Sequence, residues 1–394
     1  MLFQIFDDKA KCALIYVNGK FSDGLTPSCV QTWAYMPYMK EKNDIEYAQL
    51  YALGKTIDNL CSDTLKAKWE KAQTRAKAIL KASHEVGLNL NNHCVYDLLP
   101  RHILIEIANI KNEICRNVFK NYKKPVNYDH LLKINKMISD IKTQKLNLDL
   151  STIVRITIQD KNTYKLISES QPYIDYDMFK TVTGRLSTKK GSFPIMTLAK
   201  KYRRILLPNN NWLFEMDFNA CELRTALALL GHRQPEEDLH DWNLKHVFKR
   251  AKSRDNAKKR IFSWLYNPNS KDEAISKVYD REKLKSLYFK DNKVITPFGR
   301  EIECDEGHAI SYLVQSTAAD MVFEQMYKVW EFLKDKKSFI KFCNHDSVMI
   351  DLHTEQEYEF NEIKELFSNT RFGKFKVNCL GGKNWAEMKD LYIK

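Results

Sequence analysis

The sequence lacks the features that would tie the chain to a membrane or to a disulfide scaffold. No apolar run approaches the roughly 18 residues that a membrane span needs. Residues Met1 to Lys9 include Asp7 and Asp8 where a secretory signal would have an apolar core. The nine cysteines are an odd number and contain no Cys-x-x-Cys pair, which argues against a disulfide framework or a zinc module. We therefore expect a soluble cytoplasmic protein with free thiols and no membrane partner.

The charge balance indicates a polyanionic partner. The 394 residues are enough for two or three packed units, and a hydrophobic fraction of 44% can supply their cores. Lys and Arg number 63 against 50 Asp and Glu, a net charge of +13, which favours nucleic acid first and an anionic membrane surface second. Basic clusters recur at Lys189-Lys190, at 200–204 and between Lys249 and Arg260, where seven of twelve residues are basic. Aromatic residues interleave with them, and this favours nucleic acid.

The first 150 residues contain few chemical signals. Cys12 to Val17 is predicted to be a strand, Asn18-Gly19 is a hairpin turn signal, and residues 64–82 are predicted to be helical. Two further helices are indicated by apolar faces between residues 100 and 145, with lysines at the bend between them. Such a helical pair could bind a phosphate backbone, or its lysines could simply be solvated.

Asp217 is placed at the end of a predicted strand, Trp212 to Phe218, where an apolar helix follows up to Gly231. Ligands often bind at such strand-to-helix junctions. Glu222 has a simpler explanation, because it stands three residues after Asn219 and would complete a helix-capping box. Taken alone, Glu222 is better explained by that cap than by a functional role.

Asp346 lies in Asn344-His345-Asp346-Ser347, the predicted tip of a hairpin between strands 339–342 and 348–352. It is either an ordinary turn residue or an oxygen ligand that meets Asp217 at a divalent cation. Mg²⁺ binds one or two carboxylates together with substrate phosphates, and two ions about 4 Å apart would suit a phosphoryl displacement. The two aspartates are 129 positions apart, so sequence alone does not bring them together.

A basic and aromatic stripe occupies one face of a predicted helix. Arg254, Lys258, Phe262 and Tyr266 recur every four residues and span an arc of roughly 120°. Phosphate-binding cations beside a stacking platform would suit a nucleoside triphosphate, although such stripes are more often surface features.

Seven segments, in this order and spacing, resemble motifs of the family A DNA polymerases of the bacterial repair and phage replication type. They are Thr183-Gly184-Arg185-Leu186-Ser187, Asp217 to Arg224 (D-x-x-x-x-E-L-R), Asp238-Leu239-His240, Arg254-x₃-Lys258-x₃-Phe262-x₃-Tyr266, Thr296 to Arg300 (T-x-x-G-R), Gln315 to Asp320 (Q-x-T-A-A-D) and His345-Asp346. The resemblance covers about residues 181–352.

The resemblance implies a role for each matching residue. Asp217 and Asp346, with the Phe218 carbonyl, would hold two Mg²⁺ ions. The incoming dNTP would be bound by Arg254, Lys258, Phe262, Tyr266, Glu222 and His240, with Lys258 protonating the leaving pyrophosphate and Glu222 excluding ribonucleotides. Primer-template DNA would contact Arg185, Gln315, His345 and Arg300.

The resemblance also implies an α+β right-hand polymerase with an antiparallel palm sheet, helical fingers and a helical thumb. We place the thumb at 96–150, the palm at 151–231 and 296–394, and the fingers at 232–295. Residues 1–95 are unassigned, with an exonuclease remnant as one reading. Asp44-Ile45-Glu46 fits the letters D-x-E, but polar residues precede it and the region is short for an exonuclease. We therefore expect no proofreading, with a separate exonuclease or processivity factor as a further partner.

Several departures keep alternatives open. Ser347 stands where most family members have Glu. The related single-subunit RNA polymerases often carry Ser at this position, but Glu222-Leu223-Arg224 argues against an RNA polymerase. Asn267 replaces the Gly that usually follows the fingers Tyr. The expected function is a compact DNA polymerase, encoded by a phage or similar element. The alternatives are an RNA polymerase-like enzyme and an inactive polymerase-like accessory protein that binds nucleic acid.

Overall fold

The computed structural model describes residues 1–7, 13–42, 44–88, 93–149, 151–152, 154, 160–248 and 253–391. The chain divides into two compact units, Met1–Thr143 and Gln144–Lys394. Cys12 and positions 249–252 of the third basic cluster lie outside the described residues. Among the described residues seven cysteines are free, but Cys94 is disulfide-bonded, so the expectation of free thiols does not hold for it. No helix in the described part of the chain is both long and apolar enough to cross a bilayer.

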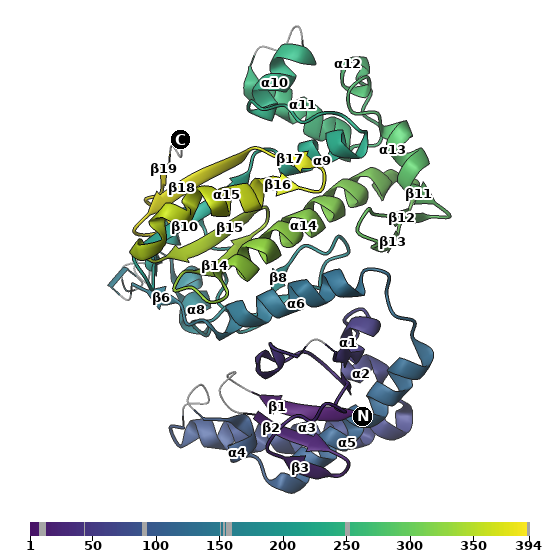
Figure 1. The fold of residues 1–394 in the computed structure, drawn as a ribbon, viewed down its shortest axis with the longest axis vertical. Helices are drawn as coiled ribbons and strands as arrows, with labels where there is room; N and C mark the ends of the chain where they lie inside the picture. Colours follow the sequence, from purple (N-terminus) through teal and green to yellow (C-terminus); the bar gives the residue numbers. More distant parts are fainter. Residues whose placement is uncertain are drawn as a thin grey trace. The chain divides into compact units, whose positions relative to one another are not determined.

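The first unit combines a small antiparallel sheet with long helices (Figure 1). Its strands are β1 (Phe3–Asp7), β2 (Ala13–Val17), β3 (Lys20–Ser22), β4 (Gln31–Thr32) and β5 (Glu46–Tyr47), and its helices are η1 (Pro37–Met39), α1 (Ala48–Tyr51), α2 (Ile57–Leu60), α3 (Asp63–Glu85), α4 (Val95–Leu98), α5 (Arg101–Asn121) and α6 (Tyr128–Thr143). Asn18 and Gly19 both adopt positive φ at the β2–β3 turn, the conformation that Asn-Gly favours.

The predicted helical pair is confirmed as α5 and α6, and the predicted helix at 64–82 as α3. Trp69 of α3 is buried with Ile110 and Ile114 of α5 in one apolar cluster. The predicted boundary at residue 95/96 therefore falls inside a single core, which joins the N-terminal region to α5.

The second unit is built on a five-stranded sheet with the order β14-β15-β10-β18-β19, in which every neighbouring pair is antiparallel. This confirms an α+β class with an antiparallel sheet. The sheet strands are β10 (Trp212–Phe218), β14 (Phe339–Asn344), β15 (Ser347–Leu352), β18 (Val377–Gly382) and β19 (Lys389–Asp390). Short strands are β6 (Asn147–Leu148), β7 (Tyr176–Asp177), β8 (Ser187–Thr188), β9 (Leu206–Leu207), β11 (Phe289–Lys290), β12 (Lys293–Ile295), β13 (Glu301–Glu303), β16 (Asn369–Thr370) and β17 (Gly373–Lys374).

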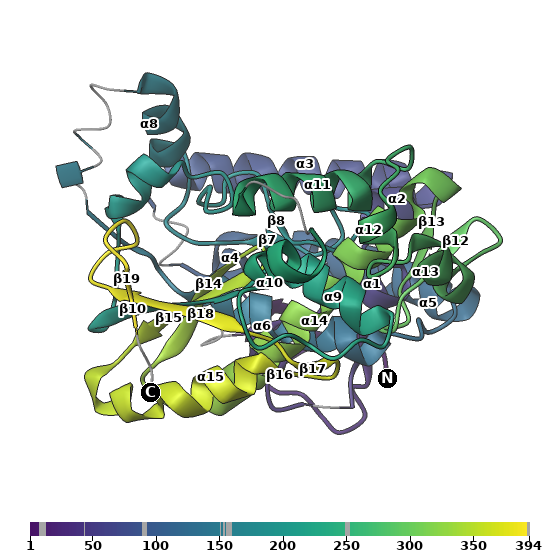
Figure 2. The ribbon, with the colours of Figure 1, turned by 90° about the horizontal axis from the view of Figure 1, so that it is seen from above.

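The helices of this unit are α8 (Lys161–Ser168), η2 (Lys200–Ile205), α9 (Cys221–Leu229), α10 (Leu239–His246), α11 (Arg254–Tyr266), α12 (Glu273–Ser276), α13 (Arg281–Tyr288), α14 (Glu306–Leu333), η3 (Thr354–Glu359) and α15 (Phe360–Ser368). Helix α15 lies against one face of the sheet, where Phe214 packs on Phe360 and Phe218 stacks on Phe367 (Figure 2). Because side chains alternate along β10, Glu215 and Asp217 project from the opposite face.

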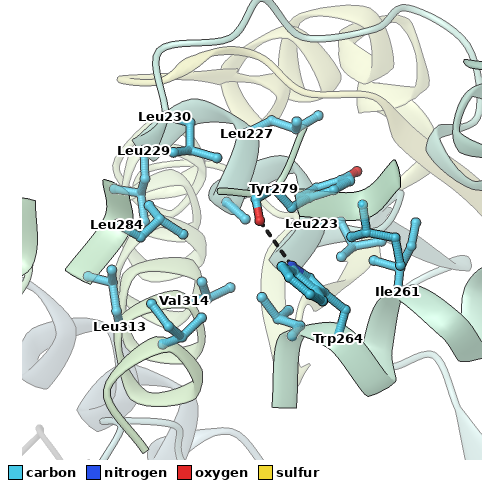
Figure 3. Close-up of a cluster of buried hydrophobic side chains, with 14 of the residues drawn as sticks. Leu223, Leu227, Leu229, Leu230, Ile261, Trp264, Tyr279, Leu284, Leu313 and Val314 are labelled. Carbon is cyan, nitrogen blue, oxygen red and sulfur yellow. Dashed lines mark hydrogen bonds between the residues drawn. The ribbon is translucent and has the colours of Figure 1, made fainter. Parts of the chain in front are cut away.

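A second apolar cluster fixes α11 beside α9, α13 and α14 (Figure 3). Leu223 and Leu227 of α9 pack with Ile261 and Trp264 of α11, and the Trp264 indole donates a hydrogen bond of 3.0 Å to the Tyr279 carbonyl. Because Ile261 and Trp264 turn inward, Lys258 and Phe262 project from a different side of α11.

Candidate active site

Strand pairing brings Asp217 and Asp346 together. β10 and β15 are neighbours, with Asp217 directly opposite Ser347, the residue after Asp346. The Phe218 amide donates a backbone hydrogen bond of 3.4 Å to the Asp346 carbonyl. Asp346 and His345 form the two-residue tip of the β14–β15 hairpin, where His345 adopts a φ of 58°. The predicted meeting of the two aspartates is therefore found in the fold.

The two carboxyl groups repel each other in a partly desolvated site. Burial raises the pKa of Asp217 to about 7, and the charges of Asp346 and Glu215 add to the increase. Burial also raises the pKa of Asp346, while His345, Arg185 and Lys258 oppose that increase. Two carboxylates that share a partly buried site are costly unless a cation helps to neutralise them, which makes the pair a candidate cation site.

A cavity of about 460 Å³ opens beside the aspartates. Most predicted site residues line it: Asp217, Phe218, Asp346, Glu222, Arg185, His345, His240, Lys258 and Phe262. Helix α14 supplies another wall through Ala318, Ala319, Val322 and Phe323. A concave site with convergent carboxylates, cations and aromatic rings suits a ligand that carries both phosphates and a base.

Glu222 is not a helix cap, so the capping-box expectation is wrong. Helix α9 starts at Cys221 after Ala220, which adopts the left-handed conformation (φ 52°), and the cap makes no side-chain hydrogen bond. The Glu222 carboxylate instead forms an ion pair with Arg185 at the cavity wall. The structure therefore assigns Glu222 to a tertiary ion pair rather than to a local cap.

A buried network holds the strand-to-helix junction. Arg224 is fully buried and donates hydrogen bonds to the carbonyls of Asn219 (2.8 Å), Pro235 (2.7 Å) and Glu237 (2.8 Å). The Asn219 side chain donates to Asp238 (2.7 Å), which caps α10. Arg224, Asn219 and Asp238 therefore fix how α10 leaves the site, a positioning role that the sequence did not indicate beyond their place in two motifs.

Helix α11 presents its predicted stripe in two parts. Lys258 and Phe262 line the cavity, and Phe262 stacks on Tyr266 with ring centroids 5.9 Å apart and an interplanar angle of 11°. Arg254 lies outside the cavity lining and pairs with Asp238 (2.9 Å) and Asp241 (3.4 Å). In this structure the Arg254 guanidinium anchors the first turn of α11 to the start of α10.

His240 lines the cavity and has one buried ring nitrogen, Nδ1. Within the described residues its Nδ1 atom has no hydrogen-bond partner. Burial and the charges of Arg254 and Lys258 lower the pKa of His240, with Asp238 opposing, which favours the neutral ring. A buried nitrogen without a protein partner is suited to contact a ligand.

The four residues predicted to contact DNA differ in their surroundings. Arg185 and His345 line the cavity. Gln315 is half-buried on α14, one turn before Ala318. Arg300 is committed elsewhere: its guanidinium makes a two-pronged ion pair with the fully buried Asp320, at 2.7 and 3.0 Å. The surroundings of Arg300 favour a structural role, and its contact with DNA stays a prediction.

The position of Arg300 also explains why residue 184 is a glycine. Gly184 adopts a φ of +76°, and a Cβ atom there would lie 2.5 Å from Cζ of Arg300. Gly184, Arg300 and Asp320 come from three different motifs, so these segments meet at one guanidinium. The spacing of the motifs alone could not show that contact.

Comparisons with known proteins match this arrangement at the level of the fold. No family model matches the sequence, and no curated protein matches it. Among solved structures, the chain is similar to the polymerase domain of Pol1 from M. smegmatis, described in complex with DNA primer-template and dNTP. The TM-score is 0.66 at 12% sequence identity, and the match covers 98% of this chain and 96% of that chain. The chain therefore has the fold of this polymerase domain, and the likeness agrees at the level of the fold with the resemblance that its motifs indicated.

Proposed function

We propose that this chain is a template-directed DNA polymerase that adds dNTPs to the 3′ end of a primer by phosphoryl transfer. The observation that carries the proposal is the β10–β15 pairing, which brings Asp217 and Asp346 to one cavity that Lys258 and Arg185 also line. The likeness of the fold to a polymerase domain seen with primer-template and dNTP supports the same substrates.

The proposed domains follow the predicted boundaries except at 95/96, where the core shared by α3 and α5 crosses the boundary. The antiparallel sheet with α9, α14 and α15 would be the palm (151–231 and 296–394), and α10 to α13 would lie in the fingers (232–295). Helices α5 and α6 would belong to the thumb (96–150).

The residues at the aspartate pair fit two Mg²⁺ ions that also bind substrate phosphates. Asp217, Asp346 and the Phe218 carbonyl offer the hard oxygen donors that Mg²⁺ prefers. Within the described residues no group of three or more His, Cys, Asp or Glu side chains is placed to bind one ion. A two-carboxylate set suits ions that complete their coordination with phosphate and water. When bound, they would neutralise charge on the attacking and leaving oxygens.

The remaining side chains would position and neutralise the substrate. Lys258 would bind the triphosphate and protonate the departing pyrophosphate, and Arg254 would leave Asp238 to bind the same phosphates. Phe262 and Tyr266 would stack near the new base pair, and His240 would contact the dNTP. Phosphoryl transfer depends mainly on such positioning and charge stabilisation.

Glu222 would occupy the space beside the 2′ position of the sugar and so exclude ribonucleotides.

Four residues are proposed to contact the DNA. Arg185 and His345 would contact the primer end from the cavity, and Gln315 and Arg300 would make the other contacts.

The absence of proofreading remains part of the proposal. Glu46 of the D-x-E segment accepts a hydrogen bond from Tyr51 (2.7 Å) and lies 3.5 Å from Lys124, while Asp44 is exposed. A carboxylate committed to neighbours within its own unit is poorly suited to hold a catalytic ion.

Primer extension tests the proposal and its alternatives together. The purified chain is given a primed DNA or RNA template, Mg²⁺ and either dNTPs or NTPs. Extension with dNTPs on DNA supports a DNA polymerase, and extension with NTPs alone indicates the RNA polymerase-like alternative. Binding without any extension indicates an inactive accessory protein. In the active case, Asp346→Asn should abolish extension while primer-template binding is retained, and normal turnover by this variant would refute the assignment.

A further inference from the structure

A third carboxylate, Glu215, lies beside the aspartate pair, and the proposed function does not use it. Glu215 precedes Asp217 by two residues on β10, so both side chains project from the same face of the sheet. That face is opposite the one on which Phe214 and Phe218 pack against α15. Glu215 is therefore aimed toward the site side of the sheet.

The hairpin is bonded to this carboxylate. Oγ of Ser347 donates a hydrogen bond of 3.0 Å to Oε1 of Glu215, and Ser347 is only 5% exposed. Ser347 follows Asp346 directly and pairs with Asp217 across the strands. The hydrogen bond therefore links Glu215 of β10 to Ser347, the residue that follows Asp346 in the hairpin.

The three carboxyl groups influence one another. Glu215 helps to raise the pKa of Asp217, after burial and Asp346. Burial raises the pKa of Glu215, with the Ser347 hydroxyl and Arg203 opposing and Asp346 adding to the increase. Because no three such groups among the described residues converge on one ion position, Glu215 is placed one bond away from the site rather than in it.

We propose that Glu215 is a positioning residue which, through Ser347, holds Asp346 toward Asp217 and adds a third negative charge that tightens divalent cation binding. The inference rests on the proposed cation site. This inference gives Ser347 a role. The Ser347 hydroxyl donates to the Glu215 carboxylate of β10, whereas a Glu at position 347 would put two carboxylates in contact.

Mn²⁺ binding to the full chain, measured without DNA, tests this inference independently of catalytic turnover. Free Mn²⁺ is measured by electron paramagnetic resonance at pH 8 for the wild type, Glu215→Gln, Ser347→Ala and the control Glu365→Gln. Glu365 lies on α15, which packs on the other face of the sheet, and it pairs with Lys374 of β17. Glu215→Gln keeps a hydrogen-bond acceptor but removes the charge, and Ser347→Ala keeps the charge but removes the bond.

We expect the Mn²⁺ dissociation constant to rise about tenfold in Glu215→Gln, the scale for losing one charge about 6 Å from a divalent ion at a dielectric close to that of water. It should rise several-fold in Ser347→Ala and remain unchanged in Glu365→Gln. In extension assays, Glu215→Gln should need more Mg²⁺ for half-maximal rate, with a maximal rate close to that of the wild type at saturating Mg²⁺. A purely structural role would alter stability but not the Mg²⁺ requirement of the folded enzyme.

Wild-type Mn²⁺ affinity in Glu215→Gln overturns the inference. If that variant does not fold, Ser347→Ala decides, and unchanged affinity there overturns it equally. A wild-type chain that binds Mn²⁺ but extends no primer contradicts the proposed function while leaving the comparison of variants intact. A wild-type chain that binds no Mn²⁺ overturns the cation site and this inference with it.

Discussion

Replacing Asp217 with Asn should abolish extension yet stabilise the metal-free protein at pH 8. Burial, Asp346 and Glu215 raise the pKa of Asp217 from 3.8 to about 7. The folded chain therefore binds the Asp217 proton more tightly than the unfolded chain does. It follows that the unfolding free energy falls as the pH rises from about 4 through 7, and that the folded state carries the full cost of the buried charge above that range.

The magnitude follows from the shift in pKa. About three pKa units at 1.36 kcal/mol each set an upper bound of about 4 kcal/mol. Asp217 retains some contact with solvent, and Asn378 stabilises its charged form by a hydrogen bond. We therefore expect Asp217→Asn to gain about 1 to 2 kcal/mol at pH 8.

Urea unfolding followed by circular dichroism, with EDTA present, measures this gain. The unfolding midpoint of Asp217→Asn should exceed that of the wild type at pH 8, and the difference should shrink at pH 5, where wild-type Asp217 is protonated. Saturating Mn²⁺ should stabilise the wild type and leave the variant nearly unchanged. A variant that is less stable than the wild type at pH 8, or a gain that does not depend on pH, would refute this reasoning.

Three further predictions concern the cavity and the sheet. Glu222→Ala should lower the preference for dNTPs over NTPs about tenfold or more in kcat/KM, and an unchanged ratio would mean that Glu222 only pairs with Arg185. Lys258→Met should lower the rate of single-nucleotide incorporation by about 10²-fold or more, with primer-template affinity by fluorescence anisotropy unchanged; a normal rate would exclude proton donation by Lys258. Asp351→Ala leaves the buried Lys341 without its partner at 2.7 Å and should cost about 3 to 5 kcal/mol in urea unfolding, whereas a loss below about 1 kcal/mol would contradict a tightly coupled pair.

Local patterns predicted the elements that carry the site. The alternation in 212–218, the hairpin around Asp346 and the four-residue period of Arg254 to Tyr266 all correspond to elements of the fold. These elements could be predicted because the periodicity of strands and helices depends on residues close together in the sequence. The meeting of Asp217 and Asp346 required strand pairing across 129 positions. Residue types alone left it as one of two readings of Asp346, and the family resemblance favoured it.

Contacts between distant segments account for what the sequence did not indicate. Glu222 matched a capping box, but the left-handed Ala220 starts the helix elsewhere and Arg185, 37 positions earlier, binds its carboxylate. Arg300 resembled a DNA contact, yet Asp320 holds it inside the fold. The hydrogen bond from Ser347 to Glu215 joins residues 132 positions apart. Each of these depends on tertiary packing, which propensity and spacing do not encode.

The most direct test of the central claim is to locate the cations. Crystals of the chain with primer-template and a non-hydrolysable dNTP analogue, soaked in Mn²⁺, would show the ions as anomalous scattering peaks. The account predicts two peaks about 4 Å apart between the carboxylates of Asp217 and Asp346. Peaks elsewhere, or none at this pair while the nucleotide is bound, would contradict it.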